Sequence, residues 1–362
     1  MTLQRHLTLV IPGLLPCSKQ DVLAYIAFHA KQTPPQTLRL RALEMILSRA
    51  SRSLSPVRGY DELIADVFAV NRQHDRDLPV GAFSALLHNV ANRQEHQKWY
   101  LRADPVHLRP DGDGLIVFGN QGLNITRAEA DAFCAEINAV YDDMPWRLFA
   151  LTPTQWLLES DVAPKMRTYA LDKVIGLSLR DYLPYGDQAK QWHAILNELQ
   201  MLMHSSSVNA ARLASGETPV NSVWFWGGGS LPESTADRHA TSWVQCWSNE
   251  SLSLALAKFT NVPRADLPAD GKQWLSQAIT PGRHLMVLED VNVSAATSDI
   301  HSWWQILSDL DERWLSPCVE ALKQGELDSL SLVTDHGQFD TNRHRVKRWW
   351  TRIRPVAFHI PR

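Results

Sequence analysis

The chain has 362 residues, 44% of them hydrophobic, which is enough apolar material for one large core or for a core and a smaller inserted domain. This balance excludes a disordered or fibrous protein. The formal net charge of −3 provides no broad basic field for nucleic acid or an anionic membrane, so such a partner would need a local patch. The four cysteines lack CxxC spacing, which argues against a zinc site or a disulfide framework and favours reduced thiols in the cytoplasm.

The first predicted element is a buried strand from Leu7 to Ile11, a compact apolar run that ends at Pro12-Gly13. The run is too short to span a bilayer, and a first strand is favoured over a signal peptide. No later apolar segment is long enough to cross a membrane, so we expect no membrane span. The stretches 37–52 and 60–71 place apolar residues at three- and four-residue intervals, which predicts amphipathic helices that cover a sheet.

A small module is predicted between residues 105 and 163. Its sequence indicates a strand at 115–118, then a helix that begins after Thr126, then a strand at 146–151. Thr126 and Glu129, three residues apart, have the pattern of a capping box at the start of that helix. A β-α-β unit of this size favours a module inserted in a larger fold, and an ordinary continuation of the main sheet is the alternative.

Strands and helices alternate through the rest of the chain, which predicts an α/β fold with a mostly parallel sheet flanked by helices. We expect residues 1–104 and 164–362 to form the core domain and residues 105–163 to form an inserted small α/β domain. We also expect three strands to end along one edge of one sheet, because ligand-binding loops gather there in parallel sheets. These strands are 7–11, 220–226 and 330–335.

The most specific stretch runs from Ile175 to Pro232. It resembles a segment of archaeal-type, cofactor-independent phosphoglycerate mutases of the alkaline phosphatase superfamily, and in particular a divergent bacterial branch described variously as mutases or regulatory proteins. The matching residues are Gly176, Asp181, Tyr182, Leu183, Pro184, Gly186, His204, Asn209, Arg212, Asn221, Trp224, Trp226, Gly227 and Gly229. The family also carries a small α/β domain with a helix start like Thr126 to Ala130. The resemblance therefore implies an alkaline-phosphatase-like fold.

The glycine run after strand 220–226 predicts a close approach of backbone to a ligand, because glycine has no Cβ and adopts positive φ. The alternative is a tight turn with tryptophans in the core. With the resemblance, we expect a cleft that binds a small anionic, phosphorylated ligand, and Arg212 offers paired donors suited to phosphate. Pairing of Arg212 with an acid such as Glu217 is the alternative. The candidate ligand-binding residues are Asn209, Arg212, Asn221, Gly227, Gly228 and Gly229.

The resemblance also implies catalytic parts that this chain lacks. Family members pass a phosphoryl group through a serine between two divalent metals held by Asp and His side chains. Where the family has Asp-Gly after the first strand, this chain has Pro12-Gly13. Ser84 is the nearest serine to the nucleophile position, but no base is visible beside it. In the next metal-binding region Asp311 can be aligned, and Asp290, Asp299 and His301 are remnants or turn residues.

Asp335-His336, at the end of strand 330–335, matches the family's metal-binding Asp-His pair, and His344 lies near the position of a further His. We name Asp335, His336 and His344 as candidate ligands for one divalent ion, Mn or Mg. The alternative is a hydrogen-bonded turn without a metal, because a site of this kind normally has more ligands. No other cofactor is expected.

The segment 343–354 holds six Lys or Arg residues interleaved with Trp349 and Trp350. A terminal helix docked through Trp349, Trp350 and Ile353 is favoured, because the overall charge does not support nucleic acid. Nucleic-acid contact and a membrane-surface helix are the alternatives. The former requires Arg343 to Arg354 to form an exposed basic face.

The sequence as a whole favours a cytoplasmic phosphoglycerate mutase-like protein with eroded metal and nucleophile sites and no assigned catalytic residue. Such a protein would act by binding a small anionic ligand or a protein partner. An active metal-dependent phosphomutase or phosphatase with an altered ligand set is the first alternative. A nucleic-acid-binding regulator is the second.

Overall fold

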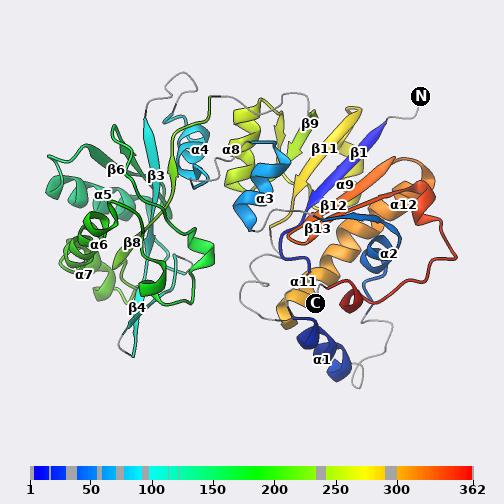
Figure 1. Cartoon of the computed structure of the whole chain (residues 1–362), viewed down its shortest axis with the longest axis horizontal. Helices are drawn as coiled ribbons and strands as arrows, with labels where there is room; N and C mark the ends of the chain where they lie inside the picture. Colours follow the sequence, from blue (N-terminus) through cyan, green and yellow to red (C-terminus); the bar gives the residue numbers. More distant parts are fainter. Residues whose placement is uncertain are drawn as a thin grey trace. The chain divides into compact units, whose positions relative to one another are not determined.

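The computed structural model describes residues 4–15, 18–29, 39–54, 59–70, 77–91, 98–112, 114–120, 122–233, 242–289 and 300–360. The chain divides into two compact units (Figure 1). Unit 1 is formed by Met1–Val70 together with Ala236–Arg362, and unit 2 by Asn71–Thr235. Unit 2 is thus a single continuous insertion in unit 1.

A seven-stranded sheet with the order β10-β9-β11-β1-β12-β13-β2 organises unit 1. Its first five strands are parallel, and the last two are antiparallel to their neighbours. The strands are β1 (Arg5–Val10), β2 (Ser51–Ser53), β9 (Trp243–Trp247), β10 (Arg264–Ala265), β11 (Gly282–Val287), β12 (Ser329–Thr334) and β13 (Gly337–Asn342). The prediction of a mixed α/β fold with a mostly parallel central sheet flanked by helices is confirmed.

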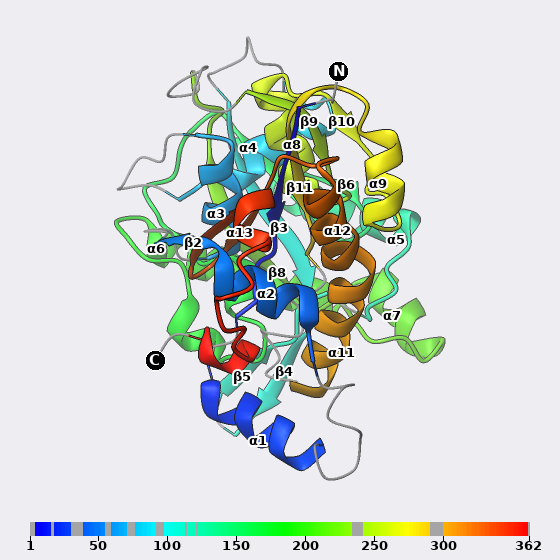
Figure 2. The same cartoon turned by 90° about the vertical axis from the view of Figure 1, so that its right-hand side faces the viewer.

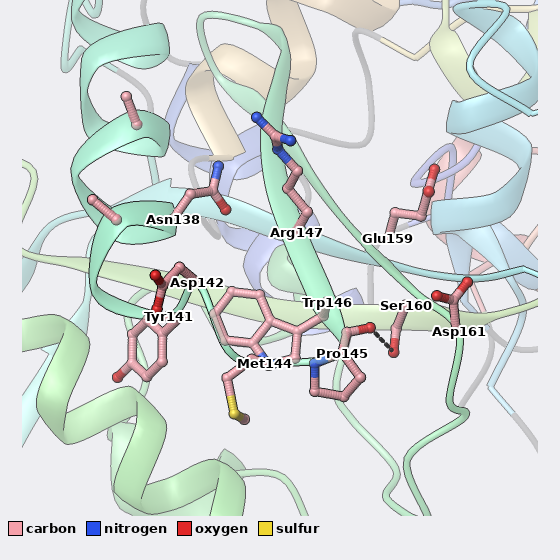
Figure 3. A pocket seen from close by; sticks show the side chains of 12 residues that line it. Asn138, Tyr141, Asp142, Met144, Pro145, Trp146, Arg147, Glu159, Ser160 and Asp161 are labelled. Carbon is pink, nitrogen blue, oxygen red and sulfur yellow. Dashed lines mark hydrogen bonds between the residues drawn. The ribbon is translucent and has the colours of Figure 1, made fainter.

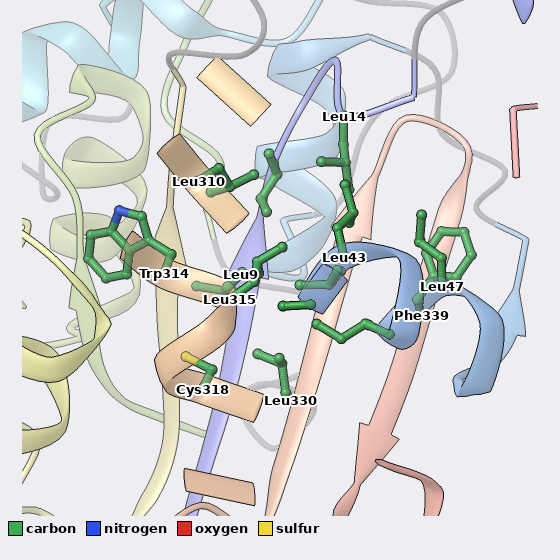
Figure 4. Packing of buried hydrophobic residues seen from close by; sticks show 14 of the residues in the cluster. Leu9, Leu14, Leu43, Leu47, Leu310, Trp314, Leu315, Cys318, Leu330 and Phe339 are labelled. Carbon is green, nitrogen blue, oxygen red and sulfur yellow. The ribbon is translucent and has the colours of Figure 1, made fainter. Parts of the chain in front are cut away.

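Helices cover both faces of this sheet (Figure 1). They are α1 (Lys19–His29), α2 (Arg41–Arg49), α3 (Tyr60–Val67), α8 (Ser251–Thr260), α9 (Gly271–Gln277), α11 (Ile300–Leu310), α12 (Ser316–Gln324) and α13 (Arg343–Val346). A π-helical turn, Asp311–Leu315, joins α11 to α12. Leu9 of β1, Leu43 of α2 and Leu310 of α11 belong to one buried cluster on one face (Figure 4). The apolar run of β1 is therefore buried as predicted.

Unit 2 contains a separate four-stranded antiparallel sheet with the order β6-β7-β3-β8 and a hairpin of β4 and β5. Its strands are β3 (Trp99–Val106), β4 (Leu108–Asp111), β5 (Gly114–Val117), β6 (Trp146–Thr152), β7 (Gln155–Ser160) and β8 (Ser222–Gly229). Its helices are α4 (Val80–Leu87), α5 (Arg127–Val140), α6 (Ala189–His204) and α7 (Ser207–Ala214). The capping box at the start of α5 is confirmed, since Thr126 and Glu129 hydrogen-bond reciprocally.

Two features of the organisation differ from the sequence expectation. Strand 220–226 was expected in the main sheet, but β8 pairs with β3 in unit 2, so that prediction is wrong. The compact unit also extends beyond 105–163 on both sides, because β3 and β8 complete the sheet that β6 and β7 begin. Strands β3 and β8 lie more than a hundred residues apart in the sequence, so no local sequence pattern predicts that they pair. No helix in the described ranges has the length and hydrophobicity needed to cross a membrane.

Candidate functional site

The carboxyl end of the central sheet brings together the segments that follow β1 and β12. The two strands are parallel and in register, and the Ile11 amide donates to the Val333 carbonyl at 2.9 Å. Immediately beyond, the Gly13 amide donates to Oδ2 of Asp335 at 2.6 Å. Two of the three strands expected to end along one edge of the sheet, β1 and β12, therefore do so.

His344 does not join this pair. Strand β13 begins at Gly337, opposite Thr334, and runs back to Asn342, opposite Ser329. His344 follows β13 in α13 and is exposed, so it lies toward the amino end of β12. The length of β12 separates it from Asp335, about 17 Å at the usual rise per strand residue. Of the three candidate metal ligands, only Asp335 and His336 thus remain close together.

The donor set at the sheet edge does not fit the two-metal clamp that the resemblance implies. Such a clamp needs several carboxylates and imidazoles that converge on one point. Here the backbone N–H of Gly13 donates to the Asp335 carboxylate. Gly13 belongs to the Pro12-Gly13 segment, where the family has Asp-Gly. Within the described residues, no group of three or more His, Cys, Asp or Glu side chains is placed to hold a metal ion.

Asp311, which can be aligned with the acid at the end of the family's E-x-x-D helix, makes a structural contact. Its carboxylate accepts the Leu43 amide at 2.6 Å and the Ala42 amide at 3.3 Å. These amides belong to the first turn of α2, whose N-cap position, Leu40, has no capping side chain. Burial raises the pKa of Asp311, the two amides oppose this effect, and the charge of Glu44 adds to it. Asp311 therefore caps a helix distant in sequence.

The other residues of this region lie elsewhere or outside the described part. His301 is on α11, where its ring contacts the Tyr25 hydroxyl at 3.0 Å and the Gln305 amide nitrogen at 2.8 Å. Asp290 and Asp299 lie outside the described residues. His301 is therefore engaged by side chains of α1 and of its own helix.

Ser84 lies in α4 of unit 2 and is 5% exposed. Its hydroxyl accepts from Nη1 of Arg102 at 3.3 Å. Arg102 in turn donates to Asp104 from Nε at 3.0 Å and from Nη2 at 2.7 and 2.8 Å, to the two carboxylate oxygens. The Trp226 indole also donates to Asp104, at 2.8 Å. Burial raises the pKa of Asp104, and Arg102 and Trp226 oppose that shift. A guanidinium cannot accept the hydroxyl proton, so this surrounding does not activate Ser84 as a nucleophile.

Arg212 is 2% exposed and is held by atoms of its own unit. Nη1 donates to Glu129 at 2.8 Å, Nε and Nη2 donate to the Thr218 carbonyl at 3.0 and 2.8 Å, and Nη2 also donates to the Leu123 carbonyl. Four of the five guanidinium N–H groups are therefore engaged. The acid it pairs with is Glu129 of the capping box, whereas the sequence suggested Glu217. Anion binding by Arg212 stays a prediction, and an anion would compete with these contacts.

The two candidate asparagines contact backbone. Asn209 is 2% exposed, donates to the carbonyls of Met203 and Val220 at 2.7 Å each, and accepts the Val220 amide. Asn221 exchanges two hydrogen bonds with the backbone of Leu108, at 2.7 and 2.8 Å. Both side chains connect the residues at the start of β8 to neighbouring segments. Asparagine at these positions is therefore explained by its hydrogen bonds to backbone groups.

The glycine run forms the last part of β8 and packs against other elements. A Cβ at Gly228 would lie 2.4 Å from the Trp99 ring. A Cβ at Gly227 would lie 2.9 Å from Val80 at the start of α4, and one at Gly229 would lie 2.6 Å from Pro79. The glycines thus allow the approach of a helix to a strand. Their proposed contact with a ligand stays a prediction.

Sequence reasoning missed a pocket of about 600 Å³ in unit 2 (Figure 3). The end of α5, the following turn and the facing ends of β6 and β7 line it. Trp146 forms part of the wall, and its buried indole nitrogen has no hydrogen-bond partner among the described residues. Arg147 and Glu159 are cross-strand neighbours there, and Lys98 pairs with Glu159. The pocket has no sequence signal because three separate segments create it.

No protein-family model matches the chain. A cofactor-independent phosphoglycerate mutase from Methanosarcina barkeri is 31% identical over 65 residues, 18% of this chain and 16% of that protein. A probable one from Geobacter sulfurreducens is 32% identical over 59 residues, 16% of this chain and 15% of that protein. The chain thus matches only about a sixth of the length of each of these curated relatives.

Among solved structures, the PH0037 protein from Pyrococcus horikoshii is similar with a TM-score of 0.53 at 10% identity, over 94% of this chain and 88% of that one. A cofactor-independent phosphoglycerate mutase from Thermoplasma acidophilum has a TM-score of 0.48 at 15% identity, over 94% of this chain and 90% of that one. The chain is therefore a mixed α/β protein whose fold is shared with a solved archaeal protein. Its curated relatives, in short segments, are cofactor-independent phosphoglycerate mutases, so it resembles that family.

Proposed function

We propose that this chain is a phosphoglycerate mutase-like protein that binds a small anionic ligand or a protein partner and does not perform the mutase reaction. The contact that carries this proposal is the hydrogen bond from the Gly13 amide to Asp335. A donor N–H stands on the side of the carboxylate from which a family member would present a second carboxylate to a metal. The positive end of the Gly13 N–H dipole occupies the place of a cation, so this arrangement favours the backbone hydrogen bond over metal binding.

Two further contacts support the same conclusion. The Asp311 carboxylate is engaged by the first amides of α2, and freeing it for a metal would uncap that helix. Ser84 is buried beside Arg102, which supplies no general base. Loss of a covalent nucleophile lowers turnover by several orders of magnitude.

The decisive experiment combines metal analysis with a mutase assay on the full chain. Interconversion of 2- and 3-phosphoglycerate is measured with manganese or magnesium in excess, on wild type and His336→Ala. We expect no turnover above the buffer in either protein and less than one equivalent of tightly bound divalent ion. Two equivalents of metal, with turnover abolished by His336→Ala, would establish the altered-ligand enzyme instead.

Ligand binding is tested separately by thermal shift with phosphate, phosphoglycerates and nucleotides. A ligand at about a hundred times its dissociation constant adds roughly 2.7 kcal/mol to the free energy of unfolding. The sequence-predicted contact, Arg212, is compared with Arg127, which is exposed and paired with Asp131 on the same helix. A ligand shift that is reduced in Arg212→Ala and retained in Arg127→Ala supports the predicted cleft. If no anion stabilises wild type, the small-ligand part of the proposal fails and a protein partner remains.

A further inference from the structure

The segment from Arg343 to Arg354 does not form the docked helix expected from its sequence. Helix α13 ends at Val346, and the chain continues without regular secondary structure to Pro355. Trp349 and Trp350 are 84% and 68% exposed, whereas eleven of the fourteen tryptophans are buried. Their ring centroids are 6.0 Å apart and the rings meet at 85°. Two large aromatic faces are therefore presented to solvent where packing was expected.

This segment is strongly basic. No acidic residue follows Asp340 in the sequence. Within the described residues, none of its six cationic side chains forms an ion pair with a carboxylate. We call it the basic-aromatic strip, made of Arg343, Arg345, Lys347, Arg348, Trp349, Trp350, Arg352 and Arg354. The condition set for a nucleic-acid interface, an exposed basic face, is met.

The strip is held at both ends by unit 1. Val346 before the tryptophans and Val356 after them are buried in the apolar cluster of the sheet. Helix α13 lies beside α2 (Figure 2), and the Arg354 amide donates to the Ser48 hydroxyl of α2 at 2.9 Å. Arg49 of α2 donates to the Val346 carbonyl. The tryptophans are thus displayed from a fixed base, which lowers the entropy lost when a partner binds.

We propose that the basic-aromatic strip binds single-stranded nucleic acid. Unpaired Lys and Arg side chains attract phosphates and release their counterions. Unstacked bases then stack on exposed aromatic rings with little dependence on sequence. Because the two indoles stand at 85° to each other, each presents its own face. The net charge of −3 gives the molecule as a whole no broad basic field for phosphates, so the attraction needs a local patch such as the strip.

A membrane surface fits the same strip less well. Membrane-surface segments of this kind use an amphipathic helix with a continuous apolar face. Here only four residues are helical, and the aliphatic Val346 and Val356 face the protein core. Two indoles without neighbouring exposed aliphatic side chains in the strip match base stacking better than insertion among acyl chains.

The test uses the full-length protein and fluorescein-labelled single strands of twelve thymidines or twelve uridines, followed by anisotropy. We expect binding that weakens with salt, with a log–log slope of about −3 to −4 if four to six phosphates are neutralised. The double variant Trp349→Ala/Trp350→Ala should bind at least about tenfold more weakly with the slope unchanged. Arg348→Ala/Arg352→Ala should reduce the slope by about 1.4.

The matched control is Arg180→Ala/Lys190→Ala, which removes the same charge from exposed positions of unit 2. It should bind like wild type. All variants should keep the wild-type melting temperature, because the changed side chains are exposed, or half-buried in the case of Arg348. Three results would each overturn the proposal. They are no binding at 50 mM salt, an unchanged affinity of the tryptophan double variant, and tighter binding to phosphatidylserine vesicles or to a duplex of equal length than to the single strands.

Discussion

Replacement of Arg212 by alanine should destabilise unit 2 strongly. The guanidinium bridges the start of α5, through Glu129, to the backbone carbonyls of Leu123 and Thr218. Its removal leaves Oε1 of Glu129 and two carbonyl oxygens without their guanidinium donor, while Oε2 of Glu129 keeps its bonds from Thr126. The Arg212 side chain is 1% exposed and that of Glu129 is 24% exposed, so water replaces the lost contacts only in part.

Breaking one side of a buried ion pair costs about 3–5 kcal/mol. Partial exposure of Glu129 places the expected loss near the lower limit, about 3 kcal/mol. For a unit of this size, 1 kcal/mol shifts the melting temperature by roughly 2–4 °C, which gives a decrease of about 6–12 °C. Thermal unfolding monitored by circular dichroism, with hydrogen exchange in β6 to β8, measures the effect on unit 2.

Acid pH gives an independent check of the same pair. Desolvation opposes ionisation of Glu129, but hydrogen bonds from Thr126 and Arg212 outweigh it and lower its pKa below the usual value. The stabilisation is therefore present above the ordinary pKa and is lost as the pH falls through the lowered one. The difference between wild type and Arg212→Ala should shrink accordingly below about pH 4.

The control is Arg127→Ala, whose exposed pair with Asp131 should contribute less than about 0.5 kcal/mol. Wild-type stability of Arg212→Ala would refute the structural role. If that variant also lost a phosphate-induced shift, the guanidinium would be a ligand contact.

Two further changes test the packing and the buried acids. Gly228→Ala should lower the free energy of unfolding by about 2 kcal/mol or more, because the new Cβ meets Trp99; Gly114→Ala, with its nearest atom at 3.7 Å, should have little effect. Equal urea midpoints for both variants would contradict this packing. Burial and the charge of Glu44 raise the pKa of Asp311, so unit 1 should lose stability as the pH rises from the ordinary value towards the raised one. Urea unfolding between pH 4 and 7 should show a flatter profile for Asp311→Asn, and an identical profile would argue against this assignment.

Local patterns predicted local structure well. The capping box of Thr126 and Glu129 needs only four consecutive residues, and the structure contains it. The apolar run before Pro12-Gly13 needs burial on both faces, which determines a central strand. The final position of β8 depends instead on β3, more than a hundred residues earlier, and no periodicity identifies such a partner.

Part of the geometry around Asp335 also follows from the order of the strands. Strands 7–11 and 330–335 were predicted to end on one edge of the sheet, and because parallel neighbours end together, Gly13 lies beside Asp335 there. The turn after β12 reverses the chain, and this reversal moved His344 away. Arg212 and Asn209 have residue types that suit a ligand, but buried arginine and asparagine also satisfy backbone groups, and only coordinates distinguish these uses.

The insertion of unit 2 within unit 1 has a consequence for synthesis on the ribosome. Strand β1 pairs with β11 and β12, which are made only after unit 2 is complete. At about 5–20 residues per second, the apolar β1 waits roughly 15 to 65 s for its partners, whereas unit 2 has all its strands as soon as β8 emerges. The nascent chain should therefore contain a folded unit 2 while β1 is still unpaired and prone to aggregation. Chaperones that shield β1 would then determine the yield of native protein.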